Sequence, residues 1–411
     1  MQKKFQPVYK FKSCHGIYNI LNNINPQCTM NTDGFKRRQF MVSIAMGSLG
    51  LMVSNLVSFC NVNKKLDSSN LSDLLFYIDL NGQKKPVTTL AEWGIKRQQI
   101  LDRIQMVMGN LPNLSSLPAL DIQILEQLKE DNYTRFAIRF TAAEKERVSA
   151  YLYVPTQKSK EKRFPAMLAL HETDSIGKKS VDGKGHNTNL AYAKELVQRG
   201  YVVIAPDYPG FGDLKDYDFK TDRYQSGTMK SIFDDMRCID LLQARADVDP
   251  NRIGVIGHSL GGHSALFVGA FDTRLKVIVS SCGWTLMDYY NAGEEATKEY
   301  GGRLGPWAQE LYMPLLRDKY DLDDKKMPFD FDEVIAALAP RAFFSNSPIN
   351  DGNFNVKGVG KGIAEVSDVY HFLGAEDKLK VRYPESEHDF PPEVRAEAYR
   401  FIDKMLGVTP K

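Results

Sequence analysis

The chain has 411 residues and a formal net charge of +2, with 43% hydrophobic and 25% charged residues. These values are typical of a globular protein that is long enough to bury a substantial core. The charge is unevenly spread, because residues 1–60 carry +6 and the rest of the chain carries −4. A slightly acidic net charge over residues 61–411 gives no reason to expect nucleic-acid binding.

The first 60 residues are predicted to be a leader rather than a domain. The segment Lys36–Val42 (KRRQFMV) precedes a largely apolar run that ends at Cys60, and this pattern resembles a bacterial twin-arginine export signal. Met30 is then a candidate start of the protein. We expect export to the periplasm or the cell exterior, with no stable membrane span after processing. A membrane anchor within the leader is the alternative, and lipidation of Cys60 is a weaker one because Phe59 does not fit a lipoprotein box.

Residues 61–132 are predicted to be an N-terminal tether and helical extension. Residues 61–90 are polar, whereas Trp93–Met108 has apolar residues at helical spacing and is followed by Gly109. The main domain is expected over residues 133–411. It begins with two segments of alternating polar and apolar residues, Tyr133–Thr141 and Arg147–Val154, which predict an antiparallel strand pair.

From Phe164 onward, short apolar runs alternate with helical patterns. The predicted strands are Ala166–Leu170, Tyr201–Ala205, Arg252–Ile256, Leu275–Ser280, Ala342–Ser345 and Leu379–Tyr383, and the predicted helices include Leu190–Arg199, Met229–Ala244 and Pro392–Leu406. This alternation predicts an α/β fold, with a mainly parallel central sheet and helices on both faces. The aromatic and charged segment Trp284–Asp332 is an insertion before a later strand. We expect it to contribute to a pocket, and a peripheral excursion is the alternative.

The segment Asn251–Ala265 contains Gly257-His258-Ser259-Leu260-Gly261, a G-x-S-x-G motif directly after an apolar run. In a nucleophile elbow the serine occupies a sharp turn between a strand and a helix, and small residues let the two backbones approach closely. The five-residue pattern alone recurs by chance. Here the preceding strand and a helix over Gly262–Ala270 supply the required context, so Ser259 is the predicted nucleophile.

A serine nucleophile needs a base, and the base needs an acid that orients it. In this type of fold the chain order is serine, acid, histidine. His388 follows the last predicted strand and is the predicted base, and Asp351 follows the strand Ala342–Ser345 and is the predicted acid. Asp377 competes but precedes the final strand, while Asp389 is adjacent to His388 and poorly placed to orient it.

Backbone N–H groups are expected to stabilise the oxyanion of a tetrahedral intermediate. One should belong to Leu260, next after the nucleophile, and the other to Glu172 or Thr173 in the loop after Ala166–Leu170. Three further side chains near these loops are candidates for substrate contact: His171, Trp284 and Trp307.

No cofactor and no metal site are predicted. The five cysteines lack the spacing of metal ligands. Cys238 and Cys282 are interpreted as buried thiols, although a disulfide between them is possible. The pair His171-Glu172 begins an H-E-x-x-H motif, but residue 175 is Ser. The acidic run 321–324 lacks the glycine and glutamate of a calcium loop.

Together these residues resemble the α/β-hydrolase superfamily, and more narrowly its dienelactone-hydrolase and acetyl-xylan-esterase-like branch of secreted bacterial esterases. The matching segments are Tyr201–Gly212, Arg252–Ala265, Ala339-Pro340-Arg341, the Asp351 turn and the His388 loop. The resemblance covers about residues 90–410. It implies attack of Ser259 on an ester carbonyl, loss of an alcohol and hydrolysis of an acyl-enzyme, with an acylated carbohydrate or another small ester as substrate. Many relatives have His-Gly where this chain has His171-Glu172, which leaves the second oxyanion donor open.

Two other functions are compatible with the sequence. A serine peptidase of the prolyl-oligopeptidase type shares the fold and the order of the triad, but the segment before Ala166–Leu170 is too short for the propeller domain usual in those enzymes. A catalytically inactive binding protein could use the same scaffold, although the set Ser259, Asp351 and His388 argues against it. The oligomeric state is left open.

Overall fold

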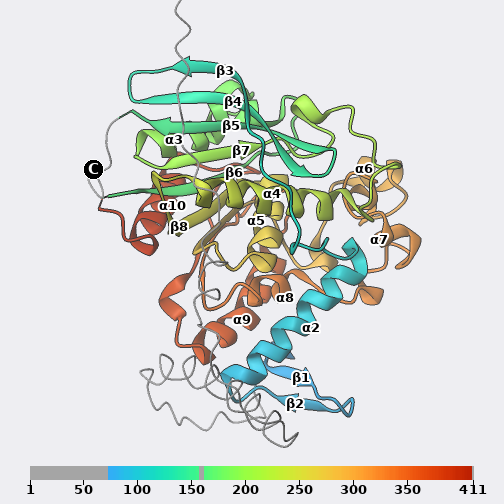
Figure 1. Ribbon diagram of the computed structural model, residues 1–411. Helices are drawn as coiled ribbons and strands as arrows, with labels where there is room; N and C mark the ends of the chain where they lie inside the picture. The colour runs from blue at the N-terminus through green and yellow to red at the C-terminus, as the bar shows by residue number, and fades with distance from the viewer. Residues whose placement is uncertain (1–72, 157–161, 410–411) are drawn as a thin grey trace, which may run out of the picture. The chain divides into compact units, whose positions relative to one another are not determined.

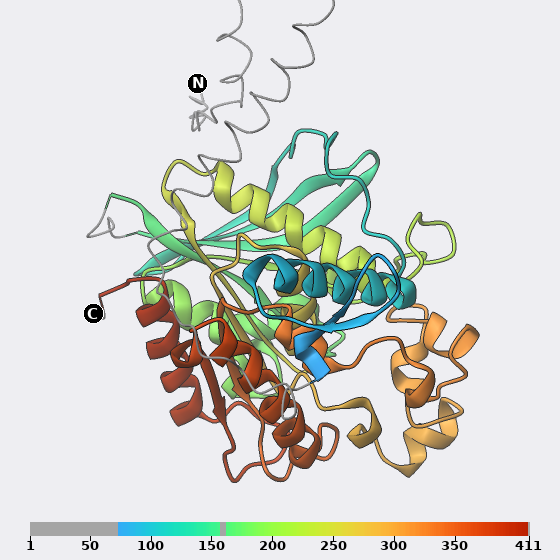
Figure 2. The same ribbon diagram turned by 90° about the horizontal axis from the view of Figure 1, so that it is seen from below.

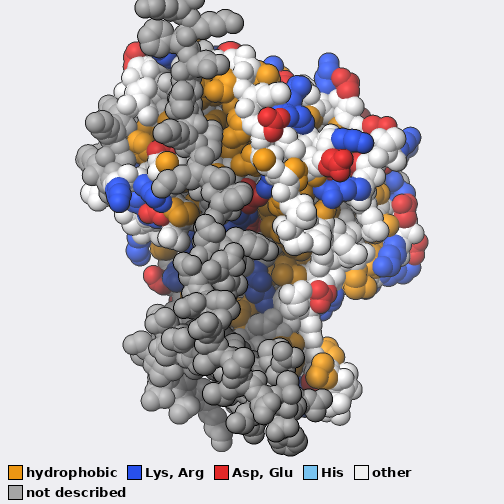
Figure 3. Space-filling view, viewed as in Figure 1, with side chains coloured by type: hydrophobic (Ala, Val, Ile, Leu, Met, Phe, Trp, Pro, Cys, Tyr) orange, Lys and Arg blue, Asp and Glu red, His pale blue; other side chains and the backbone are white. Residues whose placement is uncertain are grey.

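The computed structural model describes residues 73–156 and 162–409, and the predicted leader, with its twin-arginine motif, Met30 and Cys60, lies outside them. Leu71–Lys411 forms one compact unit, which holds the sheet and the helix expected in the N-terminal extension. Within the described residues, the search for a helix long and apolar enough to cross a bilayer finds none. On the described part of the face drawn in Figure 3, basic and acidic side chains lie intermixed.

A single sheet organises the unit (Figure 1). Within the described residues it has nine strands in the order β11-β10-β9-β8-β6-β7-β5-β4-β3. The strands are β3 (Gln123–Lys129), β4 (Tyr133–Ala143), β5 (Glu146–Pro155), β6 (Phe164–Leu170), β7 (Val202–Pro206), β8 (Val248–His258), β9 (Val277–Ser281), β10 (Ala342–Asn346) and β11 (Leu379–Arg382). The pairs from β7 through β6 to β11 are parallel, and β3, β4 and β5 add an antiparallel side.

Helices cover both faces of this sheet (Figures 1 and 2). One face packs against α3 (Tyr192–Gln198) and α10 (Pro392–Met405), and the other against α2 (Leu90–Met108), α4 (Gly227–Ala244), α5 (Leu260–Phe271), α8 (Phe331–Ala336) and α9 (Val356–Phe372). Alternate residues of one strand enter opposite cores, as Met167 and Leu168 of β6 do. The predicted α/β-hydrolase fold class is therefore confirmed.

The polar segment before α2 is more ordered than its composition indicates. The strands β1 (Phe76–Ile78) and β2 (Lys84–Pro86) form a hairpin, and the preceding Leu74 and Leu75 are buried in the core. This segment was predicted to be a tether or a peripheral segment, and from residue 73 onward two adjacent buried leucines anchor it to the core. The predicted helix is α2, and it begins at Leu90 because Thr89 and Glu92 form a capping box.

The insertion between β9 and β10 consists of short helices, including α6 (Glu294–Glu299) and α7 (Leu315–Asp318). It is attached to the start of α4, where the N–H of Gly227 donates to the carbonyl of Glu310 and that of Thr228 to the carbonyl of Tyr312. A Cβ on Gly227 would lie 2.2 Å from the carbonyl oxygen of Leu311, so this close contact requires glycine. The insertion is therefore fixed against a core helix.

Candidate active site

The turn between β8 and α5 holds Ser259 in a strained conformation. Its φ of 52° and ψ of −119° are unusual for a residue with a side chain, and such conformations cost about 1–3 kcal/mol. The Ser259 N–H donates to the carbonyl of Ser281 at 2.8 Å, and the Ser259 carbonyl accepts from His263 N–H at 2.9 Å. A Cβ on Gly261 would lie 2.0 Å from the carbonyl oxygen of Leu170. Glycine at this position therefore lets α5 begin directly against the end of β6.

The predicted acid and base are hydrogen bonded. His388 Nδ1 lies 2.9 Å from Asp351 Oδ2, and Asp351 Oδ1 accepts the N–H groups of Asn353 and Phe354 at 2.9 and 3.0 Å. Burial alone would raise the pKa of Asp351, but the bonds from His388 and from these two N–H groups lower it below its usual value. The ionised carboxylate holds the proton on Nδ1, which leaves Nε2 as the acceptor nitrogen.

The three predicted catalytic residues lie where the parallel strands end, and we call this side of the sheet its carboxyl edge, as distinct from its outermost strands. Ser259 follows β8, Asp351 follows β10 and His388 follows β11, and the carboxyl ends of these parallel strands meet at that edge. The ring of His258, the residue before the nucleophile, lies 4.9 Å from the ring of His388 between centroids. The competing acid Asp389 accepts hydrogen bonds from the side chains of Asn187 and Asn189 instead.

The competing acid Asp377 lies in a short 3-10 helix, Glu376–Lys378, ahead of β11. Asp351 is therefore the carboxylate hydrogen bonded to His388. The catalytic roles themselves remain predictions.

The loop after β6 is organised by His171. Tyr208 N–H donates to His171 Nε2 at 2.9 Å, so the proton is on Nδ1, which donates to the carbonyl of Glu172 at 2.6 Å. Burial lowers the pKa of His171, which keeps the ring neutral. With 2% of its surface exposed and both nitrogens bonded to backbone, His171 holds the loop that carries Glu172 and Thr173. Its contact with substrate stays a prediction, as do the oxyanion roles of Glu172, Thr173 and Leu260.

Aromatic side chains of the insertion pack against the elbow, and Phe354, in the turn after Asp351, connects them to the predicted base. Trp307 stacks on His263, the residue one turn into α5, with ring centroids 4.1 Å apart, and it also packs against Phe354. Phe354 in turn stacks on His388 with centroids 5.9 Å apart. Tyr312 packs with Tyr208 and Leu260 in a small buried cluster. Trp307 of the insertion and Phe354 thus form an aromatic wall beside the predicted nucleophile and base.

The two tryptophans predicted to contact substrate differ in exposure. Trp284 is 1% exposed and its Nε1 donates to Ser345 Oγ, so it lies in the core beside β10. Trp307 is partly exposed on the wall. Phe354, which stacks on the base, was not predicted, because a single aromatic residue in the turn after Asp351 carries no sequence pattern.

Cys282 is the second neighbour of the site that the sequence did not indicate. Cys238 and Cys282 are free, buried thiols, as predicted in preference to a disulfide. Cys282 follows β9 with a φ of 49°, and its Sγ lies 3.3 Å from the carbonyl oxygen of Asp389. Burial, followed by the negative charge of Asp351, raises the pKa of the Cys282 thiol.

The chain has the fold of the α/β hydrolases, in which a serine on a strained strand-to-helix turn follows a central parallel strand and a histidine follows the last strand. A family model described as "Glucuronyl esterase, fungi" matches residues 220–374. The predicted resemblance to this superfamily is thereby confirmed.

Among curated relatives, the putative hydrolase YtaP of Bacillus subtilis is 29% identical over 312 residues, which cover 73% of this chain and 96% of that protein. Among solved structures, a glucuronoyl esterase from Solibacter usitatus matches with a TM-score of 0.63 and 19% identity, covering 83% of this chain and 99% of its own. A putative acetyl xylan esterase from Bacteroides fragilis matches with a TM-score of 0.55 and 17% identity over 83% and 91%. At these identities the structures show the fold.

Proposed function

We propose that the protein is a serine carboxylic-ester hydrolase that deacylates a carbohydrate ester or another small ester. The observation that supports it most is the 2.9 Å hydrogen bond between His388 and Asp351 at the sheet edge where the elbow holds Ser259. The similarity to glucuronoyl and acetyl xylan esterases supports a carbohydrate ester as the substrate class. The identity of the acyl group is left to experiment.

In the proposed mechanism His388 Nε2 accepts the proton of Ser259 Oγ as the oxygen attacks the ester carbonyl carbon. The carbonyl electron pair moves onto oxygen, and the N–H of Leu260 and an N–H of the loop at Glu172 or Thr173 stabilise that charge. Collapse of the intermediate breaks the bond to the alcohol oxygen, which receives the proton from His388. Water then attacks the acyl-Ser259 ester by the same route and releases the acid.

The ionised Asp351 stabilises the imidazolium that forms on His388 at each step. The carboxylate can do so because two backbone N–H groups hold Oδ1 while Oδ2 remains on the histidine. Phe354, which packs against Trp307, covers one face of the His388 ring.

The test uses purified protein with an aryl acetate and a Pro-aryl-amide in parallel. We expect hydrolysis of the ester, labelling of Ser259 by a fluorophosphonate, and neither in Ser259→Ala. Cleavage of the amide alone would contradict the esterase assignment in favour of a peptidase. A folded protein that is neither labelled nor active on any ester would support an inactive binding protein. A panel of acetylated, feruloylated and methyl-glucuronoyl sugars then defines the acyl group.

We also propose that residues 36–60 direct export of the folded protein. The support is the twin-arginine pattern at Arg37 and Arg38 followed by an apolar run. In a bacterial host that exports the unmodified chain, replacing both arginines by lysine should leave the protein, and its esterase activity, in the cytoplasmic fraction. Unchanged export of the double variant would contradict this proposal.

A further inference from the structure

Three side chains at the carboxyl edge of the sheet offer metal-ligating atoms at close range. Cys282 Sγ, a carboxylate oxygen of Asp351 and a ring nitrogen of His388 all lie within 4.8 Å of one another. They follow three neighbouring strands, β9, β10 and β11. In a tetrahedral zinc site the bonds to S, N and O are about 2.0–2.3 Å, which places ligand atoms about 3.3–3.7 Å apart. Small side-chain shifts would therefore enclose a cation.

We propose that Cys282, Asp351 and His388 bind a thiophilic divalent cation of the zinc type, and that the bound cation inhibits the enzyme. A thiolate, an imidazole and a carboxylate together favour zinc over magnesium or calcium, which prefer oxygen ligands only. Three protein ligands with one open position are a known arrangement for zinc. Zinc with one thiolate, one carboxylate and one neutral imidazole has no net charge, which reduces the cost of placing the cation among buried groups.

The surroundings hold these ligands in place. Asp351 Oδ1 is fixed by two backbone N–H groups, so Oδ2 is the oxygen that can turn from His388 to a metal. The carbonyl oxygen of Asp389 lies 3.3 Å from Cys282 Sγ and is itself held by the side chain of Asn346 at 2.8 Å. Such outer contacts orient metal ligands, and losing one commonly lowers metal affinity by roughly 10- to 100-fold. The His388 side chain is 28% exposed and offers the route of entry.

Binding at Nδ1 would disable the proposed base. The metal takes the position of the Nδ1 proton, so the neutral ring carries its proton on Nε2, the atom that must accept the proton of Ser259. The thiol of Cys282 releases one proton to solvent, the proton on His388 moves from Nδ1 to Nε2, and no electrons are transferred. The inhibitory effect therefore rests on the proposed function, whereas metal binding by these three side chains does not.

Binding is tested first without reference to activity, in the full chain carrying Ser259→Ala, which retains all three ligands. Cobalt(II) is the probe, because a cysteine thiolate bound to it gives a near-ultraviolet charge-transfer band. We expect one cobalt per chain, with the band abolished by zinc and absent after the further change Cys282→Ala. Cys238→Ala removes the other buried thiol of the described residues and should keep the band. Absence of the band in protein that retains Cys282, or its survival in Cys282→Ala, would overturn the proposal.

Inhibition is tested with the aryl acetate in otherwise native protein. Zinc should inhibit reversibly, magnesium should have no effect, and a chelator should restore the rate. In Cys282→Ala the zinc concentration for half inhibition should rise about 10-fold or more, whereas Cys238→Ala should match the native protein. Equal inhibition of the native protein and Cys282→Ala would overturn the inhibitory role. If the protein with Ser259 hydrolyses no ester but the Ser259→Ala variant shows the cobalt band, the proposed function is contradicted and the proposed metal site is supported.

Discussion

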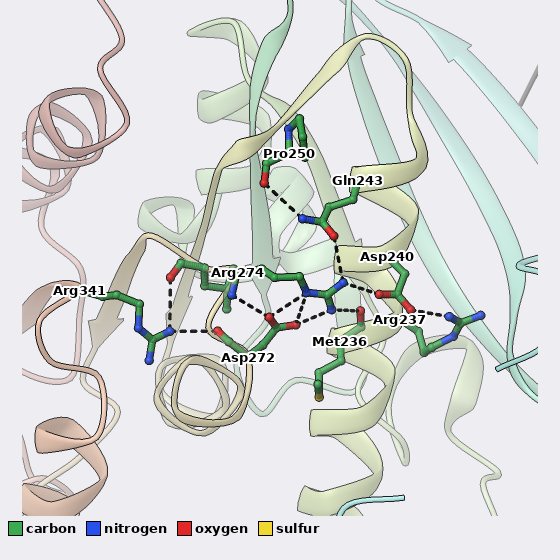
Figure 4. A network of polar contacts seen from close by, with 9 residues as sticks. Met236, Arg237, Asp240, Gln243, Pro250, Asp272, Arg274 and Arg341 are labelled. Atoms are coloured by element: carbon green, nitrogen blue, oxygen red, sulfur yellow. Dashed lines mark hydrogen bonds and ion pairs between the residues drawn. The ribbon is translucent and has the colours of Figure 1, made fainter. Parts of the chain in front are cut away.

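The two edges of the sheet are built from different chemistry. At the amino ends of β9 and β10, a network of ion pairs joins α4 and α5 (Figure 4). Arg274 donates to Asp272, Asp240 and Gln243, while Arg341 donates to the carbonyls of Asp272 and Leu275. At the carboxyl ends of β8 to β11 lie two residues with positive φ, Ser259 and Cys282, and the buried carboxylate of Asp351, which is bonded to the predicted base. Charge is buried there as well, because Asp207 after β7 pairs with Lys178.

This contrast separates stability from reactivity. At the amino edge each guanidinium in the network contacts several acceptors, so a buried charge such as Asp272 is compensated. At the carboxyl edge the strain at Ser259 and Cys282 costs stability that packing elsewhere must supply. Substitutions at the amino edge should therefore change the free energy of unfolding, whereas substitutions at the carboxyl edge should change kcat.

The largest expected effect is at the nucleophile. Ser259→Ala should reduce kcat on an aryl ester by about 10⁶-fold, because the covalent route is lost. Its melting temperature should stay near that of the native protein, because the change removes one partly exposed hydroxyl. A residual rate close to that of the native protein would exclude Ser259 as nucleophile.

Asp351→Asn should follow, with a loss of about 10⁴-fold in kcat, because an amide does not hold the Nδ1–H tautomer of His388. The matched control is Asp377→Asn, which changes the competing carboxylate ahead of β11 and should leave kcat within a few-fold of native. Steady-state kinetics on both proteins, with circular dichroism to verify folding, makes the comparison. The reverse result would move the acid to Asp377.

At the amino edge, Arg274→Met should lower the free energy of unfolding by about 3–5 kcal/mol, because it leaves the buried carboxylate of Asp272 without its guanidinium partner. Lys326→Met breaks an exposed pair with Asp321, whose side chains are 53% and 70% exposed, and should cost about 0–1 kcal/mol. Urea unfolding measures both. Both variants should keep native kcat while folded, and a loss of kcat in Arg274→Met would weaken the separation of the two edges.

The last prediction concerns acid stability at the carboxyl edge, where no change is expected at neutral pH. Burial lowers the pKa of His263 from 6.5 to about 3. The unfolded chain binds the proton first, so this stabilisation is complete above pH 6.5 and is lost as the pH falls towards 3. His263→Leu should reduce the slope of unfolding free energy against pH in this window by up to about 1.4 kcal/mol per pH unit. His258, with a pKa also lowered to about 3, should keep part of the slope. An unchanged slope in His263→Leu would show that the folded protein binds a proton at this ring as readily as the unfolded chain does.

The fold could be predicted because buried parallel strands are short apolar runs, as in β6 and β8. The motif around Ser259 predicted the strained turn between β8 and α5, where the proposed nucleophile lies. Strand β3 was missed because all seven of its residues are exposed at the sheet edge, which leaves no apolar alternation to recognise. Cys282 and Phe354 were missed for another reason. Their positions beside His388 depend on which strands are neighbours, and no local pattern records that order.

The position of His388 also sets a time at which the site can exist. It follows β11, which is an edge strand and, among the residues that the structure describes, pairs only with β10 in the sheet. During synthesis this segment emerges after the segments that carry Ser259 and Asp351. Because chains begin to fold from their N-terminal part during synthesis, a nascent chain of this protein can form most of its sheet while it still lacks its proposed base. The proposed site is therefore completed only once β11 has emerged and paired with β10.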